Sequence, residues 1–134
     1  SAFLCCRAAH PLMLRAGAGK IVSIGSMMSL FGAPYASAYG ASKGAVQSLM
    51  RALAVELAPH GIRAHSILPG WIETEMTAAG LADQRIIATV LRRIPVRRWG
   101  APSDFEGLAV YLMSDASRYQ TGGSFVVDGG YSIF

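Results

Sequence analysis

The chain has 134 residues, enough for one domain of modest size with its own core. Hydrophobic residues make up 52% of it and charged residues 15%, a composition that excludes a disordered tail. The formal net charge is +4, but the basic residues are scattered apart from a group at Arg92, Arg93, Arg97 and Arg98. Nucleic-acid-binding surfaces need a denser cationic stripe with interleaved aromatic residues, so we expect no nucleic-acid partner.

Cysteines and histidines point to neither a disulfide nor a metal site. Cys5 and Cys6 are adjacent, and their Cα atoms, about 3.8 Å apart, are closer than the roughly 4.4 Å or more that ordinary disulfides span. We therefore expect free thiols in a reducing, cytoplasmic compartment. The histidines, His10, His60 and His65, do not lie at ligand spacing from cysteines or carboxylates, so no metal is predicted. We interpret His65 as a residue that packs or that supports a site residue from behind, and not as a catalytic base.

A long uncharged run covers residues 21–42 and has the length of a bilayer-spanning helix. Serines, glycines and a proline divide it into a strand, a loop and the start of a helix, so we expect a soluble protein without a membrane segment. The chain also opens without a methionine or a basic n-region, so no signal peptide is predicted.

Hydrophobic periodicity and turn residues predict alternating helices and strands. In the first half of the chain we expect a helix over 1 to about 16, a strand over 20–25, a loop over 26–36 and a helix over 37–57. In the second half we expect a strand over 62–68, then a loop from 71 to about 95 that contains a short helix near 82–92. A helix over 102–114 and a strand over 124–127 complete the prediction. The strand over 20–25 is a short apolar run, typical of a strand buried on both faces of a parallel sheet. This alternation predicts an α/β fold with helices on both faces of the sheet.

The stretch between residues 21 and 43 carries the residues best suited to catalysis. Ser26 lies in the loop that leaves the carboxyl end of the first strand, where open α/β sheets bind ligands. Tyr39 and Lys43 are four residues apart in the following helix, so their side chains share one face. A neighbouring cation stabilises the anion of a phenol, which makes tyrosine useful as an acid or base, and Ser26 would hold the same substrate oxygen.

Two later motifs follow strands. In the run Pro69-Gly70-Trp71-Ile72-Glu73-Thr74, the proline and glycine turn the chain off the strand end and leave backbone N–H and C=O groups free to meet a carboxamide. The run Asp128-Gly129-Gly130 predicts a tight structural turn.

The chain resembles the classical short-chain dehydrogenases/reductases in four motifs that occur in the same order: Ser26, the pair Tyr39-x-x-x-Lys43, the run over 69–74 and the run over 128–130. The resemblance covers essentially all 134 residues, but only the C-terminal half of such an enzyme. It implies that residues 1–134 are the catalytic part of one Rossmann-type domain, the C-terminal half of a doubly wound parallel sheet with three strands and flanking helices. The glycine-rich turn that grips a dinucleotide and a family asparagine would lie upstream of Ser1.

The resemblance also implies the chemistry. Tyr39 would exchange a proton with the substrate oxygen, and Ser26 would donate a hydrogen bond to that oxygen. Lys43 would assist Tyr39, and both would also contact the cofactor, with the lysine bonding the nicotinamide ribose hydroxyls. The implied reaction interconverts a secondary alcohol and a ketone on a small molecule.

The cofactor implied is NAD or NADP. The Ile72 backbone and the Thr74 hydroxyl would hold the nicotinamide carboxamide, with Pro69 and Gly70 shaping the turn. Residues 75–96 resemble the family's substrate lid. Apolar residues there and in the loop before Tyr39 would either form the pocket walls or serve ordinary packing: Met76, Leu81 and Ile86 on one side, Tyr35 or Met28 on the other.

Alternatives remain open from the sequence. The chain as it stands could be a non-catalytic fragment or partner subunit that keeps the fold and a helix interface but binds no cofactor alone. A serine hydrolase would need a G-x-S-x-G elbow, whereas Ser26 is followed by Met27-Met28. Without upstream strands, the strand over 20–25 would present an exposed edge, so we expect either a longer parent protein or a homo-oligomer, a dimer or tetramer.

Overall fold

The computed structural model describes the backbone of residues 1–134 and every side chain except that of residue 79. Five helices and three strands lie along these residues. They are α1 (Ala2–Ala16), β1 (Gly19–Ile24), α2 (Ser37–Leu57), β2 (Ile62–Pro69), α3 (Ala78–Leu81), α4 (Gln84–Arg92), α5 (Glu106–Met113) and β3 (Ser124–Val127). Along the described backbone, α3, α4 and α5 follow one another without a strand between them. Short 3-10 helices link several of them, including Met27–Ser29, Pro102–Phe105 and Asp115–Ser117.

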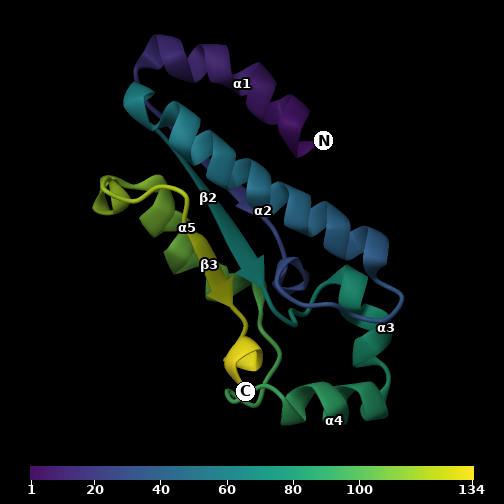
Figure 1. The fold of residues 1–134 in the computed structure, drawn as a ribbon. Helices are drawn as coiled ribbons and strands as arrows, with labels where there is room; N and C mark the ends of the chain where they lie inside the picture. Colours follow the sequence, from purple (N-terminus) through teal and green to yellow (C-terminus); the bar gives the residue numbers. More distant parts are fainter.

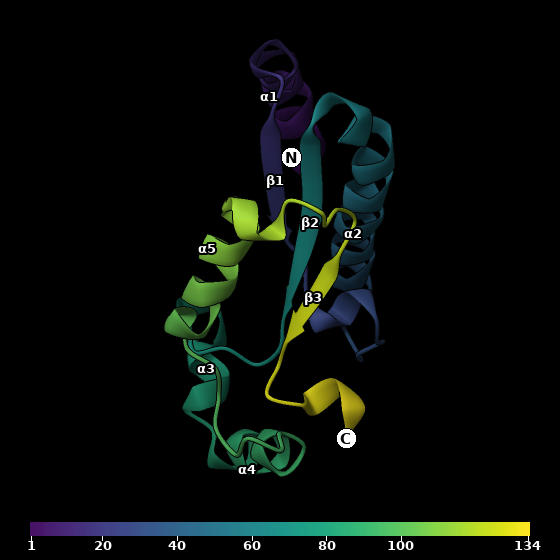
Figure 2. The same cartoon turned by 90° about the vertical axis from the view of Figure 1, so that its left-hand side faces the viewer.

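The three strands form one parallel sheet in the order β1-β2-β3. Helices α1 and α2 lie side by side on one face of the sheet and α5 lies on the other, while α3 and α4 lie beyond the carboxyl ends of the strands (Figures 1 and 2). The predicted α/β fold with a three-stranded parallel sheet and flanking helices is confirmed.

Helix boundaries follow the turn residues that the sequence supplies. Gly17 ends α1 in the left-handed conformation with φ 64°, and Gly61 does the same after α2 with φ 71°. Helix α2 and strand β3 have the predicted limits. The predicted helix over 102–114 instead begins as a 3-10 turn at Pro102 and becomes α-helical only at Glu106, because proline is well suited to a first helical turn.

The core lies around β2, the central strand. Its residues Ile62, Ala64, Ile67 and Leu68 are all buried. Met50 and Ala54 of α2 pack against Ala64, so the small residues of α2 allow a close approach between helix and strand. A second cluster, formed by Val90, Ile94 and Trp99, is the core of the segment beyond the carboxyl ends of the strands.

The prediction that the strand over 20–25 is buried on both faces is wrong. No residue of β1 is buried, and Ile24 is 53% exposed. The reason is that β1 pairs with β2 only among the described strands, so one of its edges and part of its surface face solvent.

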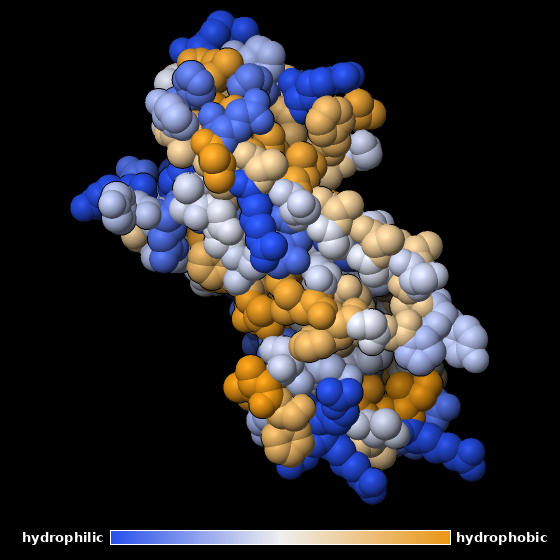
Figure 3. All heavy atoms as spheres, viewed as in Figure 1, coloured by the Kyte–Doolittle hydropathy of each residue, from blue (hydrophilic) through white to orange (hydrophobic). Residues whose placement is uncertain are grey.

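Apolar side chains are also exposed on the helices. Phe3, Leu4 and Leu12 of α1 are each at least half exposed, and no residue of α1 is buried. Figure 3 shows hydrophobic groups scattered between hydrophilic ones over the face drawn in Figure 1. Cys5 and Cys6 are free thiols, as expected. Among the described residues, no helix combines the length and hydropathy needed to cross a bilayer.

Candidate active site

Ser26 stands at the carboxyl end of β1 and is only 7% exposed. Its hydroxyl oxygen accepts a hydrogen bond from the Met28 backbone N–H at 3.1 Å, which caps the 3-10 helix over 27–29. Because this bond uses the oxygen as acceptor, the hydroxyl hydrogen remains available to donate. The local turn therefore fixes the Ser26 side chain and leaves its hydroxyl hydrogen able to donate to a ligand.

Tyr39 and Lys43 lie one turn apart near the start of α2. The Lys43 ammonium is 5.7 Å from the centre of the Tyr39 ring and donates a hydrogen bond to the Ile24 carbonyl oxygen at 3.0 Å. The bond to Ile24 ties the lysine to the end of β1, next to Ser26. Tyr39 is 39% exposed, so its ring can be reached from outside.

The segment after β2 turns sharply at Pro69-Gly70 and is then held by two anchors. The first is a parallel bridge between Ile72 and Gly100, in which Gly100 N–H donates to Trp71 C=O and Glu73 N–H donates to Gly100 C=O, both at 2.9 Å. The second is the Thr77 hydroxyl, which donates to the Ile72 carbonyl at 2.6 Å. Among the described hydrogen bonds, none uses the Ile72 N–H.

These elements surround one cleft of about 450 Å³ at the carboxyl ends of β1 and β2. All of the site residues predicted from the sequence line it: Ser26, Tyr39, Lys43, Pro69, Gly70, Ile72 and Thr74. They come from three separate parts of the chain, and the parallel sheet brings them together because its strand ends share one edge.

Of the five apolar residues considered for the substrate wall, one lines the cleft. Met76 lines the cleft, but Leu81 packs against the cluster of Val90, Ile94 and Trp99. The other three proposed wall residues, Ile86, Tyr35 and Met28, are not among the residues that line the cleft. Apolar character alone did not separate pocket residues from those that pack within the segment beyond the strand ends.

Other residues line the cleft without having been predicted. Ala109 comes from α5, Pro102 and Phe105 come from the 3-10 helix before it, and Thr77 comes from the turn after Thr74. Phe105 and Ala109 both lie within the helix predicted over 102–114, for which hydrophobic spacing alone does not separate residues that line a cleft from residues of the core. A threonine three residues after Thr74 was the available signal for Thr77, since such spacing suits a capping turn.

An ion pair holds the 3-10 helix that precedes α5. Arg98 binds both carboxylate oxygens of Asp104 at 2.7 Å, and the Ala101 N–H donates to the same carboxylate at 2.8 Å. The hydrogen bond from Arg98 holds the pKa of Asp104 well below its usual range, and the bond from Ala101 adds to this. The connection from Trp99 to α5 is thus fixed at both ends.

The run over 128–130 and His65 have structural roles. The Asp128 carboxylate accepts hydrogen bonds from Gly130 N–H and Ser132 N–H, which confirms a tight turn after β3. His65 is 1% exposed and packs edge-on against Phe125, with ring centres 5.6 Å apart. Burial lowers the pKa of His65, and the charge of Arg63 lowers it further.

Comparison with known proteins gives the family. Residues 1–132 match the family model described as enoyl-(acyl carrier protein) reductase. The chain is 42% identical over 131 residues to 5-keto-D-gluconate 5-reductase of Escherichia coli K12, covering 98% of this chain and 52% of that protein. It is also 42% identical over 133 residues to the L-rhamnose 1-dehydrogenase (NAD(P)(+)) of a Sphingomonas species, again with 98% and 52% coverage.

Solved structures of named dehydrogenases also match this chain. A gluconate 5-dehydrogenase from Burkholderia cenocepacia, in complex with NADP and tartrate, matches with a TM-score of 0.95 and 34% identity over 98% of this chain and 51% of that one. A 4-hydroxyisoleucine dehydrogenase mutant complexed with NADH and succinate matches with a TM-score of 0.95 and 33% identity, over 98% and 55%.

The chain thus spans about half the length of the curated relatives it matches. Those relatives are named as dehydrogenases and reductases, and the match to the family model runs over nearly every residue of this chain. The chain belongs to the short-chain dehydrogenase/reductase family.

Proposed function

We propose that this chain is the catalytic part of an NAD(P)-dependent oxidoreductase that interconverts a secondary alcohol and a ketone on a polyhydroxylated small molecule. The observation that carries the proposal is the single cleft that gathers Ser26, Tyr39 and Lys43 with the segment after β2. The substrate class is suggested by relatives named for keto-gluconate, rhamnose and galactitol.

The residues around the cleft suit a nicotinamide. Two parts of the chain offer hydrogen-bond donors to the cleft: α2 through the Lys43 ammonium, and the segment after β2 through the Ile72 N–H and the Thr74 hydroxyl. Two apolar side chains, those of Ile24 and Ile67, also line the cleft. Ile72 and Thr74 would hold the carboxamide, and Lys43 would bind the ribose hydroxyls. When bound, the nicotinamide supplies or accepts the hydride at the reacting carbon.

The chain's own residues would handle the oxygen and the proton. Ser26, whose hydroxyl hydrogen is free, would donate to the substrate oxygen. Tyr39 would give its hydroxyl proton to that oxygen when a ketone is reduced and take it back when the alcohol is oxidised. The Lys43 ammonium, 5.7 Å from the centre of the Tyr39 ring, is the cation nearest to this proton transfer among the residues that line the cleft.

The cofactor assignment extends to both nicotinamide dinucleotides. The two related structures described above are complexes with NADP and with NADH. The residue that senses the ribose 2′ position lies in the dinucleotide-binding half of such folds.

A second candidate is a partner subunit that keeps the fold but binds no cofactor by itself. The open edge of β1 and the exposed apolar residues of α1 favour it, because both surfaces invite another chain.

Titration of the purified chain with NADPH and NADH, followed by nicotinamide fluorescence, separates the two candidates. Saturable binding, together with oxidation of NADPH by a 5-keto sugar acid, supports the oxidoreductase. Absence of binding by a chain that circular dichroism shows to be folded favours the partner subunit.

A further inference from the structure

A second large cavity, of about 480 Å³, lies at the end of the sheet opposite the candidate active site. Its lining includes Gly19 and Lys20 at the start of β1 and Arg63 near the start of β2, whereas the active-site cleft lies at the carboxyl ends of these strands. Ala18, Ala58 and Gly61 come from the turns before these strands, and Asp115 and residues 118–121 come from the turn that follows α5. None of the residues that line this cavity also lines the active-site cleft.

Three cationic side chains, Lys20, Arg63 and Arg118, line this cavity, against one carboxylate, Asp115. Lys20 and Arg63 are partners in the parallel register of β1 and β2, so their side chains point to the same face of the sheet. The lining therefore has an excess of two positive charges.

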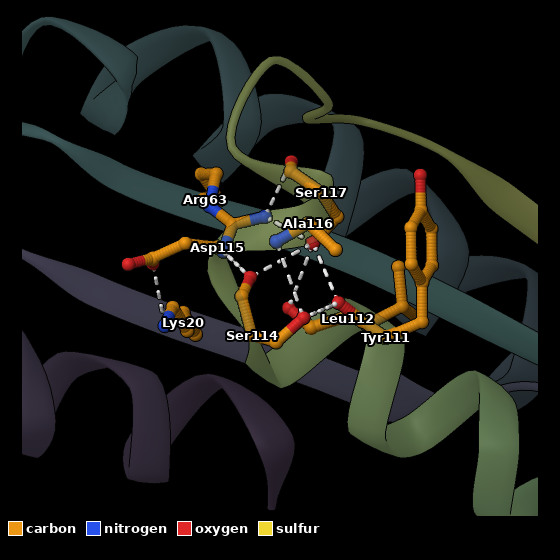
Figure 4. A network of polar contacts seen from close by, with 8 residues as sticks. All are labelled: Lys20, Arg63, Tyr111, Leu112, Ser114, Asp115, Ala116 and Ser117. Carbon is orange, nitrogen blue, oxygen red and sulfur yellow. Dashed lines mark hydrogen bonds and ion pairs between the residues drawn. The ribbon is translucent and has the colours of Figure 1, made fainter.

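The Arg63 guanidinium is fixed in position. It donates to the carbonyl oxygen and the hydroxyl of Ser117, both at 2.6 Å, and to the Ser114 carbonyl oxygen at 3.0 Å (Figure 4). A guanidinium has five N–H donors, so two remain without a partner among the described residues. Because the group is held by neutral acceptors, its positive charge is not neutralised there.

The other two cations are weakly engaged. The Lys20 ammonium contacts Asp115 at 3.4 Å, and the Asp115 side chain is 89% exposed, so water and salt screen this pair (Figure 4). Arg118 is exposed and has no ion pair within the part of the chain that the structure describes. An incoming anion would compete with Asp115 alone.

We propose that this cavity binds the phosphate group of a small phosphorylated molecule. A phosphate dianion matches the excess of two positive charges, and the planar guanidinium of Arg63 suits bidentate binding of its oxygens. Ala18, Ala58 and the exposed ring of Tyr119 line the rest of the space and would contact the organic part of the ligand. Binding there leaves the active-site cleft free.

The test is an NMR titration of the chain with inorganic phosphate, with sodium chloride adjusted so that ionic strength stays constant. We expect saturable shifts of backbone amides around the cavity, at Gly19, Gly61 and Gln120. Arg118→Gln should weaken binding about two- to fivefold, in line with the loss of one solvent-exposed charge contact. Arg51→Gln, which removes an exposed arginine from α2 outside the cavity, is the matched control and should leave the affinity unchanged.

Two further ligands define the chemistry. Phenyl phosphate should bind more tightly than inorganic phosphate if Tyr119 contacts the organic part, and the gain should vanish in Tyr119→Ala. Citrate at the same ionic strength should bind more weakly than phenyl phosphate; tighter binding of citrate would overturn the assignment to a phosphate. Shifts that grow linearly without saturation, or equal effects of Arg118→Gln and Arg51→Gln, would overturn the site itself.

Discussion

Ser26 combines two roles that a substitution can separate. Replacement by alanine removes the acceptor of the Met28 N–H, which should cost about 1 kcal/mol of unfolding free energy or less, as for a helix cap. It also removes the donor proposed for the substrate oxygen, so kcat should fall by roughly 10² to 10³. Denaturant unfolding and steady-state kinetics measure the two effects.

Ser29, in the same turn, provides the control for Ser26. Its hydroxyl is buried and has no hydrogen-bond partner among the described residues, so Ser29→Ala breaks no described hydrogen bond. Both stability and turnover should stay close to the wild-type values. If Ser26→Ala turned over as fast as Ser29→Ala, the proposed role of Ser26 would be wrong.

His65 should make stability depend on pH. Burial, and secondly Arg63, lower its pKa below the ordinary value of 6.5, so the unfolded chain binds a proton more readily than the folded chain does. Its contribution to the free energy of unfolding is therefore fully present above pH 6.5 and is lost as pH falls from there towards the folded pKa. Urea unfolding across this window should give a slope that disappears in His65→Asn.

An unchanged slope in His65→Asn would show that other groups control stability in this range.

The same residue shows what a sequence can reveal at this scale. The sequence places His65 within the strand predicted over 62–68, but the edge-on contact with Phe125 joins positions sixty residues apart. Such a contact follows from the order of strands in the sheet, and local pattern does not specify it.

At the scale of elements, the ends of β2 and β3 meet very closely at Gly70. A Cβ atom added there would lie 2.6 Å from the Asp128 Cβ and 2.7 Å from its Cα, and a backbone atom cannot easily move aside. Gly70→Ala should therefore lower the free energy of unfolding by roughly 1–3 kcal/mol, as overpacking does. Thermal or urea unfolding measures this change.

Gly107→Ala in α5 is the matched control for Gly70. Nothing lies within 4 Å of an added Cβ there, and alanine favours a helix by about 1 kcal/mol over glycine, so stability should hold or rise. Equal losses in the two variants would contradict the close approach of the two strand ends.

The sequence predicts elements best where one signal dominates. Helix α2 has a long periodic stretch between clear turn residues, and its limits were predicted correctly. The segment over 71–95 has a looser pattern and contains two helices, α3 and α4, where one was expected. The Ile72–Gly100 bridge that holds it comes from two loops, for which hydrophobic periodicity carries no information.

For the whole molecule, the open edge of β1 and the exposed apolar side chains of α1 predict self-association of this chain. Unpaired strand edges and apolar patches gain free energy when another chain covers them. Size-exclusion chromatography with light scattering should give a mass well above that of one 134-residue chain. A well-folded, monodisperse monomer would contradict this prediction.

The central claim is that the hydroxyl of Tyr39 transfers the proton in an NAD(P)-dependent reaction. The most direct measurement is the single-turnover rate of NADPH oxidation by Tyr39→Phe, which removes that oxygen and keeps the ring. We predict that the rate falls by roughly 10² or more while the NADPH dissociation constant changes less than about threefold. A variant that oxidises NADPH at nearly the wild-type rate would contradict the claim.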